Sequence, residues 1–428
     1  MRRHRTVNGL GLVLLLLFFL PDKGWTQFVV EGELRPRTEF RHGYQTLASP
    51  SSKTAIFTSQ RSRLTLRYRG DRFRIGISLQ DVRVWGDEEQ LQDIPSTALH
   101  EAWGIVEFTP EVRLKFGRQE LVYDDHRLLG NVGWTQQARS HDAAVLKFRK
   151  GTWKVDLGAA YNNSAEKLFR SRYGLNNYRS LFFLWVNTSV NRSIKLSVTA
   201  VADGFEVADT SRDDITYRYT LGPHVQIKTD PWRFTGTAYY QTGKDRFQRS
   251  ITAFLAAFRA RLGLNKFSIT GGIDYLSGTD GVNPPDNRMR TFHTLYATNH
   301  KFYGTLDYFL NIPVHTRNGG LVDILGRVSL LPSEQVTASV DYHHFRLAGR
   351  VPDPFNPEKA IDKSLGSELD AVIEYRFLPE VNLKAGYSMM FPTASMEILK
   401  GGNRDTFQYW GWMMITIKSQ LFKGKSNP

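Results

Sequence analysis

Apolar and polar residues alternate along most of this chain, and the pattern is clearest between residues 61 and 80. Leu64, Leu66 and Tyr68 fall on one side of an extended strand, while the other side carries Arg61, Arg63, Arg67 and Arg69. After a turn at Gly70 and Asp71 the alternation resumes. A strand with one apolar face and one face of a single charge is typical of a membrane barrel, where apolar side chains meet lipid and polar ones line a water-filled lumen.

The same two-residue period recurs to the end of the chain in runs of about 9 to 13 residues, long enough for a tilted strand to cross a bilayer. Very short connections alternate with long polar ones, as the turns and loops of outer-membrane barrels do. The sequence therefore predicts an all-β, transmembrane antiparallel β-barrel with short periplasmic turns and long extracellular loops. Its long loops are predicted at residues 41–54, 85–97, 123–139, 163–177, 204–214, 347–365 and 392–404.

The stretch 278–319 decides how many strands the barrel has. Treated as one long loop, it leaves 18 strands. Residues 291–297 and 302–312 also pass as strands, which would make 20. Both counts are even, so parity does not choose between them.

Residues 1–26 are predicted to be a secretory signal peptide, because arginines precede an apolar run that is only about half of a membrane-spanning length. Residues 27–428 then form a single barrel domain, since no linker or shift in composition divides them. The 428 residues contain no cysteine and carry a net charge of +14. Because the positive charge lies within strand alternation in a secreted chain, we expect no nucleic-acid partner.

Basic residues on the polar side of the strands are candidates for an anion path, since arginine pairs with carboxylate in a bidentate manner and is always charged. The alternative is that they form ion-pair ladders that stiffen the wall. Arg118 falls on the apolar side of its strand, so a bulge at Gly117 is expected to turn it inward. The candidate path residues are Arg61, Arg63, Arg67, Arg74, Arg113, Lys115, Arg118, Arg139, Lys147 and Arg149.

Asp124, Asp125 and His126, followed by Arg127, allow three interpretations. Two carboxylates and an imidazole can activate water, or hold a divalent cation through oxygen ligands. Adjacent residues of a strand face opposite ways, however, so the three converge only in a turn. The interpretation we favour is that Asp124, Asp125 and also Asp142 anchor loops through ion pairs with arginines such as Arg127 or Arg139.

Three stretches give the chain a resemblance to the alginate-export porin family: residues 78–90, 114–148 and 295–309. Within them, residues 117–119 as a turn, the acidic pair at 124–125 and residues 139–143 opening the next strand stand in the order typical of that family. The resemblance covers most of the mature chain. It implies an 18-stranded barrel with a lumen lined by arginine and lysine and narrowed by inward loops, through which anionic polyuronate diffuses.

On the same resemblance, residues 290–312 form a lumenal loop. His300 and Lys301 are then expected to contact substrate, with Asp307 tethering the loop to a wall arginine. Tyr303 and neighbouring aromatic residues equally well pack the loop as a plug.

The expected function is that of a monomeric, anion-selective porin of the bacterial outer membrane, with no cofactor or metal and no enzymatic activity. The open alternatives are a general anion or oligosaccharide uptake porin and, in another class, a barrel hydrolase. Its expected partners are anionic saccharides, outer-membrane lipid and, because the last strand is rich in aromatic residues, the barrel-assembly machinery. A periplasmic export partner is expected from the family alone.

Overall fold

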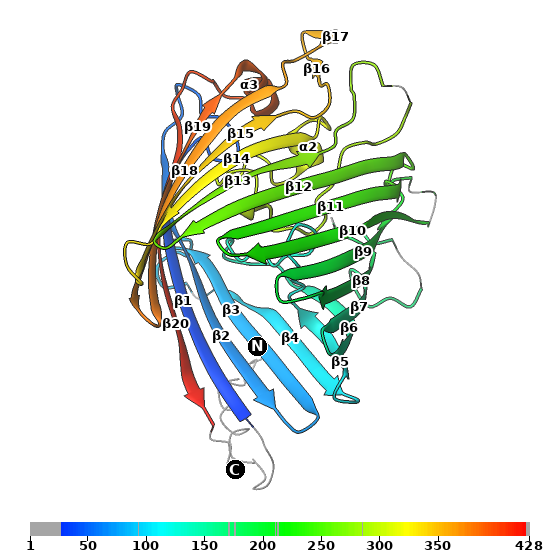
Figure 1. The fold of residues 1–428 in the computed structure, drawn as a ribbon, viewed down its shortest axis with the longest axis vertical. Helices are drawn as coiled ribbons and strands as arrows, with labels where there is room; N and C mark the ends of the chain where they lie inside the picture. Colours follow the sequence, from blue (N-terminus) through cyan, green and yellow to red (C-terminus); the bar gives the residue numbers. More distant parts are fainter. Residues whose placement is uncertain are drawn as a thin grey trace, which may run out of the picture.

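Eighteen strands form one closed antiparallel barrel in the described part of the chain (Figure 1). The structure, a computed structural model, describes residues 27–424 except 93, 170–171, 175–176, 210, 212–213 and 285. The predicted signal peptide lies outside the described residues. Each barrel strand pairs with its neighbour in the chain, and β1 (Gln27–His42) closes the ring against β20 (Gln408–Lys423).

The other barrel strands follow one another with two small interruptions. A two-stranded hairpin, β16 (Pro352–Asp353) and β17 (Asn356–Ala360), lies in the loop before β18, and the helix α3 (Ala394–Lys400) lies in the loop before β20. No helix among the described residues is long and apolar enough to cross a membrane. The remaining strands are β2 (Ala55–Arg69), β3 (Phe73–Val84), β4 (Thr97–Glu107), β5 (Val112–Gln119), β6 (His141–Lys150), β7 (Trp153–Tyr161), β8 (Ser180–Ser189), β9 (Ile194–Glu206), β10 (Ile215–Thr229), β11 (Trp232–Lys244), β12 (Ser250–Leu264), β13 (Phe267–Leu276), β14 (Leu321–Leu330), β15 (Val336–Arg346), β18 (Ser364–Leu378) and β19 (Val381–Pro392).

Short turns gather at one end of the barrel and long loops at the other. Connections of two to five residues join strands at the end where β1 begins and β20 ends. The opposite end carries the long loops, within a few residues of their predicted bounds, and also a loop at residues 245–249 that is short enough to escape the sequence pattern. The predicted architecture is confirmed with 18 strands. The alternative of 20 is wrong, because the chain between β13 and β14 forms no barrel strand.

Side chains along each strand point alternately to the lumen and to the outer face, as the sequence predicts. In β6, Val145 is fully buried on the lumenal side, whereas Leu146 is 42% exposed on the outer face. Its cross-strand neighbour Leu157 is also on the outer face and is 55% exposed. Large apolar side chains with no protein cover are at home only where lipid covers them, so the outer row is the lipid-facing one.

Arg118 is the exception, and the expectation that it points inward is wrong. The ladder runs without a register shift through Gly117, which pairs with Trp103, and Arg118, which pairs with Ala102. Arg118 therefore stays on the outer face and makes an ion pair of 3.3 Å with Asp142 of β6, which is also outward. Residues 117–119 end a strand instead of forming a turn, and the expected role of Asp142 as a loop anchor is wrong, because its partner among the described residues is Arg118 of the neighbouring strand.

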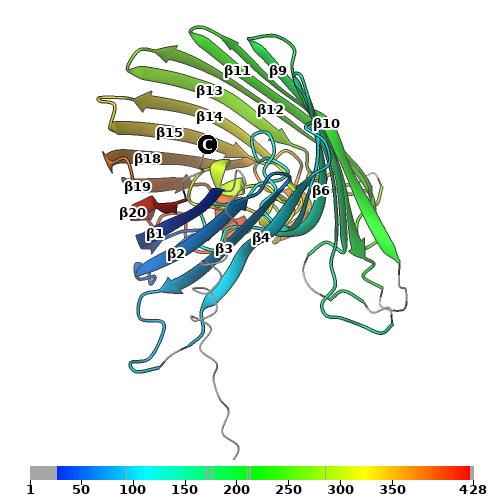
Figure 2. The same cartoon turned by 90° about the horizontal axis from the view of Figure 1, so that it is seen from below.

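Two loops fold back into the barrel. We call residues 120–140, between β5 and β6, the first inward segment, and residues 277–320, between β13 and β14, the second inward segment. The second contains a 3-10 helix, η1 (Asn299–Lys301), and a single helical turn, α2 (Ile312–His315). Seen from below, these segments lie inside the ring of strands (Figure 2).

The two inward segments pair with each other. Leu129 and Tyr296 form a parallel bridge, the amide of Gly130 donates to the carbonyl of Tyr296 at 2.9 Å, and the amide of Thr298 donates to that of His126 at 3.0 Å. Leu129 and Phe309 are almost fully buried in the cluster between the segments and the wall. The lumen is thus narrowed by a packed body, in agreement with the predicted inward loops.

Single cysteines on opposite faces of β5 test which face lines the lumen and which faces lipid. The chain has no cysteine of its own, so each variant carries one reactive thiol. In a Lys115→Cys variant, a bulky, charged and water-soluble thiol reagent should lower the single-channel current. In an Arg118→Cys variant the same reagent should leave the current unchanged, because the residue lies outside the barrel. An equal fall in current for both variants would mean that Arg118 faces the lumen.

Candidate functional site: the cation-lined lumen

Arginines of β1 and β2 bind main-chain carbonyls of the first inward segment. Arg35 donates to the carbonyls of Gly133 and Thr135 at 2.8 and 2.9 Å, and its neighbour Arg37 donates to that of Trp134 at 2.7 Å. Arg61 is bound to Glu33 and reaches the carbonyl of Gln136 at 3.4 Å. Loop carbonyls buried inside the barrel need donors, and these guanidinium groups supply them.

The acidic pair at the other end of this segment is divided between two anchors. Asp124 accepts hydrogen bonds from the Trp185 indole, Ser197 and Thr199, at 3.0, 2.6 and 3.2 Å, so it binds uncharged donors of β8 and β9 and no arginine. Asp125 pairs with Arg127 at 2.9 Å. The two carboxylates thus bind different partners and do not converge on one point. Hydrolysis or cation binding would require them to converge.

Arg127 ties both inward segments to the wall. Its guanidinium, 3% exposed, pairs with Asp274 of β13 at 2.9 Å, accepts Phe302 against its face at 4.0 Å and donates to the Tyr303 hydroxyl at 3.2 Å. Burial lowers the pKa of Arg127, but Asp274, Tyr303 and Asp125 together raise it above its usual value, so the charge is kept. Tyr303 is itself buried and packs the second inward segment, away from any passage.

Asp307 and His300 hold the second inward segment internally. Asp307 accepts from the Tyr44 hydroxyl and bonds to His300 at 2.7 Å, so the expected tether to a wall arginine is wrong. The His300 ring stacks on Trp134 of the first inward segment, with ring centroids 4.5 Å apart. His300 therefore connects the two inward segments, and its side chain also lines a cavity of the lumen.

A close backbone approach fixes this segment to β18. Gly304 has a φ of +79°, and a side-chain carbon there would lie 2.5 Å from the Glu368 carboxylate. The next two residues also bind β18. The Leu306 N–H donates to Glu368 at 2.7 Å, and the Thr305 hydroxyl donates to Asp370 at 2.5 Å. Only glycine allows this approach.

The predicted path cations Arg67 of β2, Arg74 of β3 and Arg113 of β5 already form ion pairs with wall carboxylates. Arg67 binds Glu31 at 2.5 Å, and Arg74 binds Glu107 at 2.6 Å. The weakest pair is Arg113, 3.9 Å from that same Glu107. These residues line the lumen, as the strand pattern predicts, but their charge is largely balanced.

Two other predicted path cations share a single carboxylate. Lys147 and Arg149 contact the two oxygens of Asp156 at 2.6 and 2.5 Å, so a single carboxylate is shared by two cations. Arg139 lies off the wall altogether: it donates to the carbonyl of Ala297 at 3.1 Å and so joins the two inward segments.

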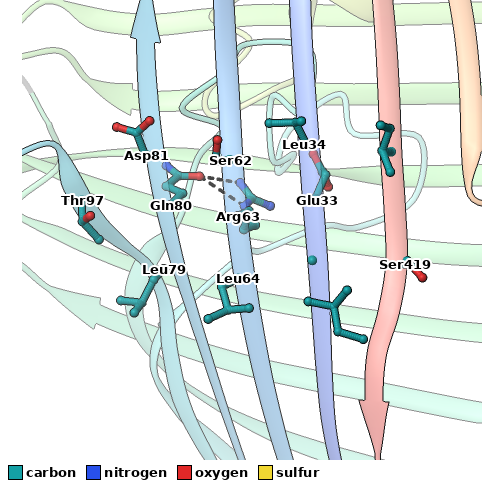
Figure 3. Close-up of a pocket in the computed structure, with 13 residues that line it drawn as sticks. Glu33, Leu34, Ser62, Arg63, Leu64, Leu79, Gln80, Asp81, Thr97 and Ser419 are labelled. Atoms are coloured by element: carbon teal, nitrogen blue, oxygen red, sulfur yellow. Dashed lines mark hydrogen bonds between the residues drawn. The ribbon is translucent and has the colours of Figure 1, made fainter. Parts of the chain in front are cut away.

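Besides Arg139, two predicted path cations, both on the wall, are without a carboxylate partner in the described part of the chain. Arg63 donates only to the amide oxygen of Gln80, at 2.7 Å (Figure 3). Lys115 has only the ring of Trp103, with the ammonium 4.4 Å from its centroid.

A further basic part of the lumen lies on the opposite wall and is absent from the residues predicted from the sequence. A cavity of about 400 Å³ beneath the second inward segment is lined by Arg259, Arg261, Lys301 and Arg327, with Asp341 as its carboxylate. We call it the basic chamber. Arg259 pairs with Asp274 at 2.6 Å and Arg327 pairs with Asp341. The alternation of residues 254–262 would have placed the first two on the lumenal face.

Two cations of the basic chamber keep their charge unbalanced. Arg261 forms no ion pair with any described residue. Lys301 donates to the main-chain carbonyl of Asp125 at 3.1 Å. Burial lowers the pKa of the Lys301 ammonium, so it loses its charge at a lower pH than an exposed lysine does.

A larger cavity, of about 530 Å³, is not part of the passage. Figure 3 shows Leu34, Leu64 and Leu79 along it, in the row of side chains that faces lipid. All three are exposed on the outer face. In the membrane this groove is covered by acyl chains, so it carries no substrate.

A closed barrel with inward segments and a basic lumen defines a porin of the outer membrane. The family model described as "Alginate export" matches residues 27–397, and the chain belongs to this family. The barrel therefore sits in the outer membrane, with lipid around it.

Solved porin structures share the fold at low sequence identity. Acinetobacter baumannii OccAB4 is 12% identical, with a TM-score of 0.60 over 93% of this chain and 98% of that one. Pseudomonas aeruginosa OccK3 (OpdO) is also 12% identical, with a TM-score of 0.61 over 92% and 96% of the two chains. No curated protein matches the sequence.

Breaking the Arg127 anchor tests whether the inward segments are fixed. An Arg127→Met variant removes the buried cation that Asp125 and Asp274 share, while Arg259 still pairs with Asp274, so the cost should be near the lower end of the roughly 3–5 kcal/mol range for breaking a buried pair. We expect a lower urea midpoint for unfolding in detergent, and larger, noisier single-channel currents. Arg118→Met is the matched control, because an exposed outer-face pair contributes less than about 1 kcal/mol. A folded Arg127→Met barrel with wild-type conductance and noise would show that the segments do not set the aperture.

Proposed function

We propose that this porin gives passive, anion-selective passage to uronate-containing saccharides of the alginate type. The observation that carries the proposal is the basic chamber, in which four cations face one lining carboxylate directly below the inward segments. The family supports a saccharide as cargo, and the charge of the chamber supports an acidic one.

The arrangement suits a polymer that must keep moving. A uronate chain carries one carboxylate per sugar, and passage requires sites that are attractive enough to enter yet weak enough to leave. Cations that already hold wall carboxylates, such as Arg74 and Arg327, offer moderate attraction. Arg63, Lys115 and Arg261 add unbalanced charges between them. The family description favours export, and a passive channel follows the concentration gradient.

Blockage of ionic current tests the cargo. In planar bilayers, short oligouronates should block wild-type channels, while neutral oligosaccharides of equal length should block them far less. Arg261→Gln should weaken the oligouronate block by about fivefold, the loss expected for one partly solvated charge contact. Arg118→Gln removes the same charge from the outer face and should leave the block unchanged.

Two results would contradict the proposal. Equal blockage by acidic and neutral sugars would indicate a general saccharide porin. Equal weakening by Arg261→Gln and Arg118→Gln would mean that the net charge of the protein acts, and not the chamber.

A further inference from the structure

Trp103 lies on the lumenal wall with a glycine opposite it on each neighbouring strand. It stands opposite Gly76 of β3 on one side and Gly117 of β5 on the other. A side-chain carbon on Gly76 would lie 2.3 Å from the indole ring, so the ring occupies the space that any other residue would fill. Gly117 has a φ of +105°, in the region that favours glycine. The Trp103 ring lying over Gly76 makes an aromatic surface inside the barrel.

Two hydrogen-bond donors on this surface have no partner. The indole N–H of Trp103 finds no acceptor among the described residues, and the Lys115 ammonium forms neither a hydrogen bond nor an ion pair with them. The ammonium rests on the Trp103 ring, a contact worth less than a hydrogen-bonded ion pair. A carboxylate entering here would draw Lys115 off the ring and uncover it.

The surface opens into a cavity of about 540 Å³ with further aromatic walls. Tyr123 and Trp185 line it with their ring centroids 5.2 Å apart. Their polar ends are fixed, since the Tyr123 hydroxyl donates to Asp156 at 2.9 Å and the Trp185 indole to Asp124 at 3.0 Å. Glu101, in the same cavity, accepts only the amide of Glu120, at 3.1 Å, so one of its oxygens remains available to a hydroxyl.

We propose that Trp103 and Lys115 form a binding subsite for one sugar-acid residue of the passing chain. This inference rests on the proposed function and adds a site on the wall opposite the basic chamber. The Trp103 ring packs against the apolar C–H face of the pyranose, Lys115 pairs with its carboxylate, and the indole N–H and Glu101 bind hydroxyls. Such a set recognises a sugar and an acid together, which isolated arginines do not.

Residence times of single blocking events separate the two halves of the subsite. Trp103→Leu should shorten the residence of oligouronates and of neutral oligosaccharides alike, by about two- to tenfold, the range of one aromatic contact. Lys115→Gln should shorten the residence of oligouronates only. Arg118→Gln, on the opposite face of the same strand, and Trp153→Leu, at an exposed position of β7, should change neither. A wild-type urea midpoint for unfolding in detergent shows that each variant has folded.

The outcomes distinguish this inference from the proposed function. If oligouronates block the wild type selectively but Trp103→Leu and Lys115→Gln keep wild-type residence times, the subsite is wrong and the proposed function stands. If Lys115→Gln shortens neutral and acidic blocks equally, the carboxylate contact is wrong. If oligouronates do not block the wild type at all, the proposed function and the subsite fail together.

Discussion

The interior of this barrel depends on guanidinium groups that bind carbonyl oxygens and carboxylates away from bulk water. An eighteen-stranded barrel encloses more space than its wall side chains can fill. Two loops fill that space, and their main-chain groups need partners inside the lumen. Arg35 and Arg37 supply donors to residues 133–135, and Arg127 joins both loops to Asp274. Without these clamps the loops would leave the lumen for solvent, and the channel would lose its narrow part.

Cationic side chains therefore have two roles at different depths of the lumen. Near the loops, arginine is structural: Arg61 holds Glu33 and a loop carbonyl, and Arg139 joins the two inward segments. Below them, on facing walls, Lys115 and Arg261 lack a carboxylate within the described residues and remain available to an anion. A cation is structural where its side chain binds a carbonyl of an inward segment, as Arg61 and Arg139 do.

The sequence predicted the wall well and its interior poorly. Strand parity is local, so the barrel and the lumenal side of Lys115 and Lys147 could be predicted from the alternation, whereas the choice of 18 strands over 20 came from the family resemblance. Arg118 was misplaced because a bulge was assumed where the two-residue period simply continues to the outer face. The partners of Asp124 on β8 and β9, and Tyr44 as a partner of Asp307, lie far along the chain and are brought near only by closure of the barrel, so no local pattern predicts them. Arg259 and Arg261 followed the period and were overlooked.

Ion selectivity of the unmodified channel measures the balance between paired and unpaired cations most directly. With a tenfold gradient of potassium chloride across a planar bilayer, the reversal potential should have the sign of chloride permeation. It should move toward zero as ionic strength rises, because salt screens the lumenal charge. A reversal potential with the sign of potassium permeation would mean that the carboxylates of the lumen outweigh its cations, contrary to an anion-conducting passage.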